Sequence, residues 1–324
     1  MRVVRSLPEA PSGATSVVTI GNFDGLHRGH ASILRTVSER ADRLGAIAVA
    51  ITFDPHPLKH LHPERAPRLI ATLEQRIALI AQSGIDLLLI QDFNEHFSRL
   101  SPEQFIDSYL IRHFRTQALC VGHNFRFGHQ HRGNVDTLSQ WADRFEVIEI
   151  GPVVAGNQSV SSSRIRNLLA EGRVSLARKM LGRCYEMEGN VVAGAGRGRN
   201  VTVPTINMQP SNEVIPRDGV YLTRIAPDGG PYQAAVTNVG VRPTFGETER
   251  TVETHILDGT TPMAGKHPRL RFLRRLRDER KFPGPEELLD QIQRDIATAH
   301  KFFRRFDRST CRPVAEGSVA GASG

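Results

Sequence analysis

Cysteine and long apolar runs are both scarce in this sequence. Three cysteines (Cys120, Cys184 and Cys311) occur in 324 residues, and no two of them form a Cys-x-x-Cys pair. This spacing argues against a disulfide framework and against a cysteine zinc site, as is typical of a reducing cytoplasm. No apolar run approaches the ~18 residues that a membrane helix needs, and the first residues lack the apolar core of a secretory signal. We therefore expect a cytoplasmic protein with no membrane partner.

Acidic residues are fewer than basic ones. The chain has 42 lysines and arginines against 34 aspartates and glutamates, which gives a net charge of +8. A net positive charge of this size is compatible with a nucleic-acid partner. However, the densest basic cluster, residues 269–281, alternates with apolar residues as a strand with one solvated face does. Because binding of a small polyanion such as ATP explains the excess at least as well, we expect small-molecule substrates and no nucleic-acid partner.

The length of the chain suggests two domains, and the residue pattern changes near its middle. Up to residue 183, short apolar runs alternate with stretches of helical periodicity. These runs are residues 15–20, 46–52, 85–90, 118–121 and 145–150. Strands that alternate with helices predict an α/β, Rossmann-like domain with a parallel sheet, in which ligands bind beyond the carboxyl ends of the strands.

From Tyr185 onward, short β-like runs are separated by glycine and proline turns, which predicts a small antiparallel β-barrel. The runs are residues 185–192, 219–224, 233–239, 250–257 and 269–276. A terminal helix is expected from about Glu286 to Phe303. We divide the chain into domains at 1–183 and 184–307, with the small, polar segment 308–324 as a disordered tail.

Residues 21–30 read Gly-Asn-Phe-Asp-Gly-Leu-His-Arg-Gly-His and follow the first apolar run directly. A helix that begins here would present unpaired N–H groups to an anion, and the glycines would let the backbone approach it closely. His27 and His30 would donate hydrogen bonds to phosphate oxygens. A His-x-x-His pair arises easily by chance in a chain with 13 histidines, so the argument depends on the whole string.

That string resembles the HxGH nucleotidyltransferase signature in the form found in bacterial FAD synthetases. The resemblance implies that His27 and His30 are catalytic. It also implies ATP or phosphate contacts at Gly21, Phe23, Asp24 and Gly25.

Two further strings follow predicted strands. Residues 52–57 read Thr-Phe-Asp-Pro-His-Pro, which by itself indicates a rigid turn. The string matches the Thr-Phe-x-Pro-His-Pro string of FAD synthetases, and this resemblance implies a binding role for His56. Residues 121–128 read Val-Gly-His-Asn-Phe-Arg-Phe-Gly, which alone could be core packing or a platform for a flavin or adenine ring. The family carries a similar string here, which implies flavin or nucleotide contacts at Asn124, Phe125 and Arg126.

Residues 161–166, Ser-Ser-Ser-Arg-Ile-Arg, indicate the start of a basic helix. Hydroxyls, N-terminal amides and an arginine would also make a cradle for pyrophosphate. The family string is Ser-Ser-Thr-x-Ile-Arg, so Ser163 replaces a threonine and keeps its hydroxyl. The resemblance implies that Ser162, Ser163 and Arg164 bind the phosphates that leave.

A second glycine-rich loop, residues 192–199, precedes the string Val-Pro-Thr-Ile-Asn at 203–207. The amides of glycines in such a loop can wrap phosphates, which makes Gly194, Gly196 and Gly198 candidate ATP contacts. Thr205 and Asn207 are two residues apart on a predicted strand, so both oxygens can reach one hard cation such as Mg²⁺.

Strings at 216–221, 238–245, 252–255 and 277–282 then follow in the order and spacing of riboflavin kinases. Alone, Glu253 is a surface glutamate of a strand. The resemblance implies that it is the catalytic carboxylate, a general base that orients a primary alcohol toward the γ-phosphate while Mg²⁺ offsets charge. The sequence differs from the strings of the family at 201–203 and at 263–265, and at 263–265 an aromatic residue of the family is absent.

The chain is thus identified as resembling the prokaryotic bifunctional riboflavin kinase/FMN adenylyltransferases. The resemblance implies that riboflavin is phosphorylated to FMN and FMN is adenylylated to FAD, with ATP, riboflavin, FMN and Mg²⁺ as ligands. One alternative is an adenylyltransferase for another substrate whose β-domain only binds flavin. Glu253 with Thr205 and Asn207 argues against it, because binding alone does not require them. The other is a nucleic-acid-binding or regulatory flavin protein, which steep salt dependence of RNA or DNA binding would support.

Overall fold

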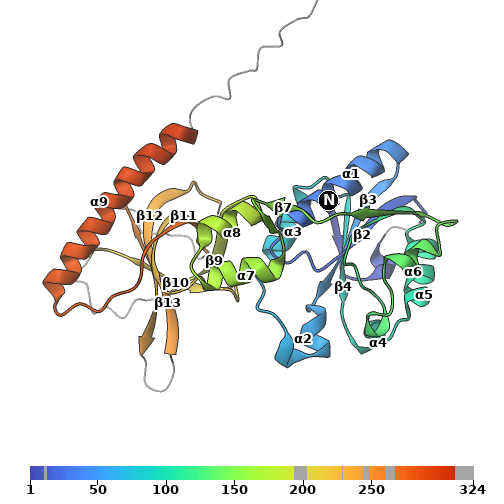
Figure 1. The fold of residues 1–324 in the computed structure, drawn as a ribbon, viewed down its shortest axis with the longest axis horizontal. Helices are drawn as coiled ribbons and strands as arrows, with labels where there is room; N and C mark the ends of the chain where they lie inside the picture. The colour runs from blue at the N-terminus through green and yellow to red at the C-terminus, as the bar shows by residue number, and fades with distance from the viewer. Residues whose placement is uncertain (11–12, 193–202, 228, 244–247, 260–266, 311–324) are drawn as a thin grey trace, which may run out of the picture. The chain divides into compact units, whose positions relative to one another are not determined.

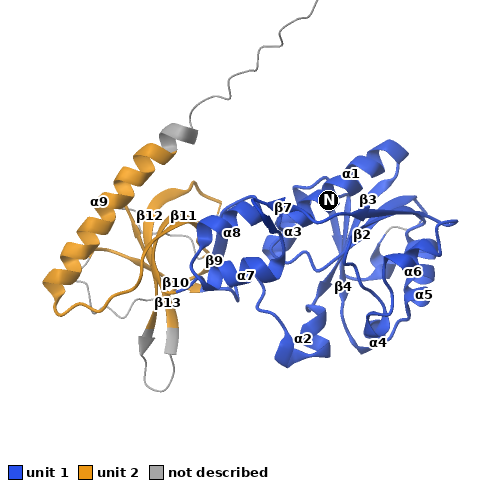
Figure 2. Ribbon diagram, viewed as in Figure 1, with its two compact units in different colours: residues 1–187, 210–217 blue, residues 188–209, 218–324 orange. Residues whose placement is uncertain are grey.

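The structure is a computed structural model that describes residues 1–310 except 11–12, 193–202, 228, 244–247 and 260–266 (Figure 1). The chain divides into two compact units (Figure 2). Unit 1 contains residues 1–187 and 210–217, and unit 2 contains 188–209 and the chain from 218 onward.

Unit 1 is built on a sheet of six parallel strands in the order β1-β4-β3-β2-β5-β6. The strands are β1 (Arg2–Val4), β2 (Ser16–Ile20), β3 (Ile47–Asp54), β4 (Leu87–Asp92), β5 (Thr116–Gly122) and β6 (Glu146–Ile150). The predicted α/β class is therefore confirmed. The five predicted runs all form strands, and the three-residue edge strand β1 was not predicted.

Helices cover both faces of this sheet (Figure 1). They are α1 (Arg28–Leu44), α2 (Pro57–Leu61), α3 (Leu73–Ala81), α4 (Glu95–Ser98), α5 (Pro102–Phe105) with a π-helical continuation (Ile106–His113), α6 (Val135–Ser139), α7 (Ser162–Ala170) and α8 (Val174–Leu181). Apolar residues of α1 and α3 form one core with the sheet, and those of α5, the π-helical segment and α6 form the other. The burial of both faces explains the continuous apolar runs of the central strands.

Local sequence sets where these helices begin. Ser101 caps α5, and its side chain and that of Gln104 satisfy each other's backbone N–H groups, while Pro102 occupies the first helical position. Ser161 caps α7, with its hydroxyl accepting from the N–H of Arg164 at 3.3 Å. The start of α7 agrees with the helix start predicted at 161–166.

The strand order places β2 between β3 and β5. From β2 the chain continues to β3 and β4 on one side of the sheet, whereas β5 and β6 lie on the other side. Loops that leave the carboxyl ends of such neighbouring strands diverge and leave a crevice for a ligand. The strings at 21–30, 52–57 and 121–128 all occupy this edge of the sheet.

Unit 2 contains the closed antiparallel barrel, with strand order β10-β13-β12-β11-β14-β9. The strands are β9 (Tyr185–Val192), β10 (Ile206–Pro210), β11 (Gly219–Ala226), β12 (Gln233–Pro243), β13 (Thr248–Ile256) and β14 (Arg269–Arg277), and the terminal helix is α9 (Pro285–Thr310). The predicted barrel and terminal helix are confirmed. A chain of buried hydroxyls crosses the interior, with Oγ1–Oγ1 distances of 2.7 Å from Thr223 to Thr237 and 2.9 Å from Thr237 to Thr254.

The unit boundaries differ from the linear division at residue 183. Segment 210–217 begins at the last residue of β10 and precedes β11, but it belongs to unit 1, as do the first three residues of β9. There the Asn212 amide donates to the carbonyl of Ile70 at 3.1 Å, and the Glu213 carboxylate accepts from the N–H of Leu69 at 2.8 Å. Helix α9 also reaches Thr310, so it includes the first three residues of the predicted tail. Residues 311–324 lie outside the described part of the chain.

Candidate active sites

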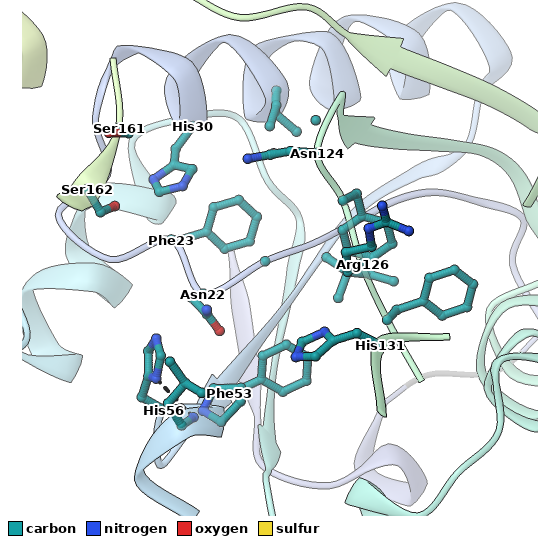
Figure 3. A pocket seen from close by; sticks show the side chains of 18 of the residues that line it. Asn22, Phe23, His30, Phe53, His56, Asn124, Arg126, His131, Ser161 and Ser162 are labelled. Carbon is teal, nitrogen blue, oxygen red and sulfur yellow. Dashed lines mark hydrogen bonds between the residues drawn. The ribbon is translucent and has the colours of Figure 1, made fainter. Parts of the chain in front are cut away.

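A cavity of about 890 Å³ lies at the carboxyl edge of the unit 1 sheet (Figure 3). It is lined by the turn after β2, the start of α1, the loop after β3, the loop after β5 and the start of α7. Of the predicted site residues, those that line it are Gly21, Phe23, His27, His30, His56, Asn124, Phe125, Arg126, Ser162 and Ser163. The structure thus brings together residues from four separate strings.

The turn after β2 has an unusual backbone. Phe23, Gly25 and Leu26 have φ angles of +46°, +73° and +37°, in the left-handed region that non-glycine residues rarely adopt. Phe23 is nonetheless buried, and its ring meets His30 edge-on with centroids 5.4 Å apart. Strained backbone held by buried contacts is typical of ligand-binding turns.

The two histidines of this turn form a stacked pair. Their ring centroids are 3.7 Å apart with an interplanar angle of 13°. His27 caps α1, since its Nδ1 accepts from the backbone N–H of His30 at 3.2 Å. An acceptor at Nδ1 means that the proton of the neutral His27 ring is on Nε2.

Both histidines are held in the neutral form. Burial, together with the charges of the Arg183 and Arg166 guanidinium groups, lowers the pKa of His27 to about 4. Burial, with the charges of His27 and Arg183, also keeps the pKa of His30 well below its ordinary value. At neutral pH the pair can therefore donate hydrogen bonds without carrying a charge of its own.

The loop after β3 contributes His56, which caps α2 by accepting the N–H of Leu58 at 3.2 Å. Burial, with the charge of Arg166, lowers its pKa to about 4. The loop after β5 contributes Phe125 and Phe127, whose rings stack with centroids 5.4 Å apart. Asn124 and Arg126 are exposed beside them and line the cavity (Figure 3).

Three predicted phosphate contacts do not line the cavity: Asp24, Gly25 and Arg164. The Asp24 carboxylate is buried and faces the protein, where it accepts from the N–H of Ile70 at 2.9 Å and pairs with Arg166 at 2.7 Å. Arg164 is exposed and donates to Gln158. Asp24 therefore shapes the turn from behind rather than facing a ligand.

The sequence analysis assigned no role to three arginines close to this turn: Arg76, Arg166 and Arg183. Arg166 lies within the serine-rich string, but Arg164 was chosen instead. Residues two apart on a helix point in nearly opposite directions, so only one of the two can face Asp24. Arg76 and Arg183 donate to backbone carbonyl groups. Because every residue has a carbonyl group, these contacts leave no recognisable motif in the sequence.

In unit 2, three polar residues occupy neighbouring register positions across strands β10, β13 and β12. Glu253 is paired with Asn207 on one side and with Asn238 on the other. Their chain neighbours Val252, Thr254 and Met208 are buried, so the three polar residues belong to the outer face of the barrel.

Next to this row, a Cβ at Gly240 would lie 2.3 Å from Oε1 of Glu279, so a larger residue there would displace that carboxylate. Asn238 begins the predicted kinase string at 238–245 and has no predicted role of its own. Thr205 lies one residue before β10 and is exposed. Gly194, Gly196 and Gly198 lie outside the described residues, as do the departures at 201–202 and 263–265.

Comparison with known proteins assigns both halves of the chain. The family model for FAD synthetase matches residues 10–164, and that for riboflavin kinase matches residues 181–303. The chain belongs to the bifunctional riboflavin kinase/FMN adenylyltransferase family. This confirms the family predicted from the sequence. The Escherichia coli K12 protein of that name is 32% identical over 305 residues, which are 94% of this chain and 97% of that protein.

The Bacillus subtilis bifunctional riboflavin kinase/FMN adenylyltransferase is 34% identical over 296 residues, covering 90% of this chain and 93% of that protein. A crystal structure described as a macrolide-efflux protein from Streptococcus pneumoniae matches with a TM-score of 0.84 and 28% identity, over 92% of this chain and 98% of that one. Among the described residues, no helix combines the length and the apolar character needed to span a bilayer.

Proposed function

We propose that the chain makes FAD from riboflavin in two steps at two sites. In unit 2, riboflavin is phosphorylated to FMN by ATP. In unit 1, FMN is adenylylated to FAD by a second ATP, with release of pyrophosphate. The observation that supports the second step best is the cavity at the switch point of the sheet, where a neutral histidine pair begins helix α1.

In adenylyl transfer, an oxygen of the FMN phosphate forms a bond to the α-phosphorus of ATP as the bond to the β-phosphate breaks. FMN is already an anionic nucleophile, so the site needs positioning and charge stabilisation more than a base. The N–H groups at the start of α1 and neutral His27 and His30 would donate to the α-phosphate. Ser162 and Ser163, at the start of α7, would hold the departing pyrophosphate. Phe125 would support an aromatic ring of either substrate.

In the kinase reaction, Glu253 would accept the proton of the riboflavin 5′-hydroxyl as that oxygen attacks the γ-phosphate. The hydroxyl of Thr205 and the amide oxygen of Asn207 are hard donors suited to Mg²⁺, and Asn207 is the register partner of Glu253. Mg²⁺ offsets the charge of the transferred phosphate when it is bound. A cytoplasmic location and the lack of a nucleic-acid partner remain predictions.

The proposal is tested by a chromatographic time course of the purified chain with riboflavin, ATP and Mg²⁺, in which FMN should appear first and FAD second. Replacing His27 and His30 by alanine should abolish FAD formation and spare FMN formation. Glu253→Gln should do the opposite, blocking FMN formation while FAD still forms from added FMN. His96→Ala, at an exposed histidine of α4, is the matched control. Unchanged FAD output from the double histidine variant would refute the role of the pair.

A further inference from the structure

Every backbone carbonyl of the turn from Asn22 to His27 has a hydrogen-bond donor within unit 1. Two of these donors belong to the local backbone: the N–H of Leu26 binds Phe23 O at 3.1 Å, and the N–H of Ala31 binds His27 O at 2.9 Å. The other four carbonyls are bound by side chains from distant parts of the sequence. These contacts are Arg76 to Asn22 at 3.1 Å, Ser162 to Asp24 at 3.0 Å, Arg183 to Gly25 at 2.7 Å and Arg183 to Leu26 at 2.8 Å. The Thr52 hydroxyl also donates to Asn22 O, at 3.3 Å.

The peptide group is planar, with its N–H and C=O pointing in opposite directions. A donor that fixes a carbonyl therefore also fixes the direction of the N–H in the same peptide group. Successive N–H groups that converge in this way form an anion-binding nest, and the left-handed φ angles of the turn favour such an arrangement. Asn22, Phe23 and His27 line the cavity, whereas Arg76 and Arg183 do not. Both arginines therefore bind the side of the turn that faces away from the cavity.

Arg183 follows helix α8 and holds the end of the turn that leads into His27. Its two terminal nitrogens bind two consecutive carbonyls, which uses the fork of the guanidinium group and could not be matched by a lysine. One of those carbonyls belongs to Leu26, a residue in the strained left-handed region. The positive charge of Arg183 also lowers the pKa values of both histidines.

Arg76, in helix α3, holds the other end. Its side chain is only 2% exposed, and Nη1 donates to Asn22 O and to Phe53 O at 3.1 and 3.2 Å. One guanidinium group thus joins the loop after β2 to the carboxyl end of β3. Burying an arginine under a sheet edge is costly. The partners of this side chain are two backbone carbonyls, the Thr52 hydroxyl and, at 3.8 Å, the Asp54 carboxylate, all at the ends of β2 and β3, which indicates a positional role.

We propose that Arg183 and Arg76 are positioning residues for adenylyl transfer, which hold the turn by its carbonyls so that its N–H groups, other than that of Leu26, face the phosphates of ATP. This inference rests on the proposed function of the histidine turn. Neither arginine touches a substrate. Their loss should therefore lower the rate of FAD formation while leaving the KM for FMN unchanged, because the rings that would contact the flavin lie on other loops.

The test uses the full chain with Arg183 replaced by methionine, lysine or alanine, and Arg173→Met as the control. Arg173 is exposed, and its side chain pairs with Glu171. We expect Arg183→Met to reduce kcat for FAD formation from FMN and ATP by roughly 10- to 100-fold, as displaced catalytic groups do. FMN formation from riboflavin should stay at the level of the parent chain, and Arg173→Met should change neither reaction.

Two further measurements separate positioning from general stability. Added guanidinium ion should partly restore FAD formation in Arg183→Ala, whereas urea at the same concentration should not. Arg183→Lys keeps the charge but lacks the fork, so it should keep the native fluorescence of Trp141, in unit 1, and still form FAD slowly. An Arg183→Met variant with normal FAD kinetics, or a loss of both reactions that guanidinium does not reverse, would overturn the inference. If His27 and His30 prove dispensable in the same assay, the proposed function fails instead.

Discussion

Acid should destabilise unit 1 through His27 in particular. Its native pKa of about 4 lies below the ordinary value of 6.5, because folding buries the ring beside two guanidinium groups. Between these pH values the unfolded chain binds a proton that the native protein does not, so stability present above pH 6.5 is lost as the pH falls toward 4. For this one histidine the loss is about 2 kcal/mol at about pH 5 and about 3 kcal/mol at about pH 4.

Urea unfolding followed by fluorescence of Trp141 measures this effect, because the single tryptophan of the chain packs against the core of unit 1. The comparison is between the parent chain and His27→Gln at about pH 7.5 and about pH 5. The variant loses the helix cap, which costs about 1 kcal/mol at both pH values. It should then lose about 2 kcal/mol less than the parent as the pH falls.

The control is His96→Gln, whose replaced histidine is exposed in α4. Its stability should follow that of the parent chain at both pH values. If the parent and His27→Gln lose stability in parallel, then His27 is not held neutral by burial, and its role as an uncharged donor must be abandoned.

Three predictions concern the barrel, each measured as thermal inactivation of FMN formation. Gly219→Ala should cost about 1–3 kcal/mol, because φ is +153° and a Cβ would lie 2.7 Å from the carbonyl of Arg277. Thr237→Val should cost about 1–3 kcal/mol by breaking the buried hydroxyl chain. Asp295→Ala should cost about 3–5 kcal/mol, because it leaves Arg277 without its buried partner from α9. A variant that loses FMN formation at the same temperature as the parent chain would contradict the structural reason given for it.

The strands and helices that the sequence predicts are those with strong local patterns. The central strands of unit 1 are buried on both faces and therefore read as continuous apolar runs, which place them within a few residues of their observed bounds. Strand β1 has three residues and is defined only by its pairing with β4, a contact that no local pattern records. Segment 210–217 is similar, since its assignment to unit 1 depends on Asn212 and Glu213 reaching residues far away in sequence.

The sequence likewise predicts some residues of the candidate site and not others. His27, His56 and Asn124 come together because each follows a parallel strand at the same edge of the sheet, and strand order alone implies this. The family string Ser-Ser-Thr-x-Ile-Arg has its arginine at the position of Arg166, so the string itself favours Arg166 over Arg164. Arg183 could not be found from its sequence context, because its partners are carbonyl groups rather than particular side chains.

The interrupted sequence of unit 1 has a consequence for how the protein is made. A ribosome delivers the chain from its N-terminus, so residues 210–217 emerge only after strands β9 and β10 of the barrel have been synthesised. Until then, the backbone groups of Leu69 and Ile70 lack the partners that Glu213 and Asn212 later provide. The contacts that close the segment beside Asp24 therefore form only after the first barrel strands have been synthesised.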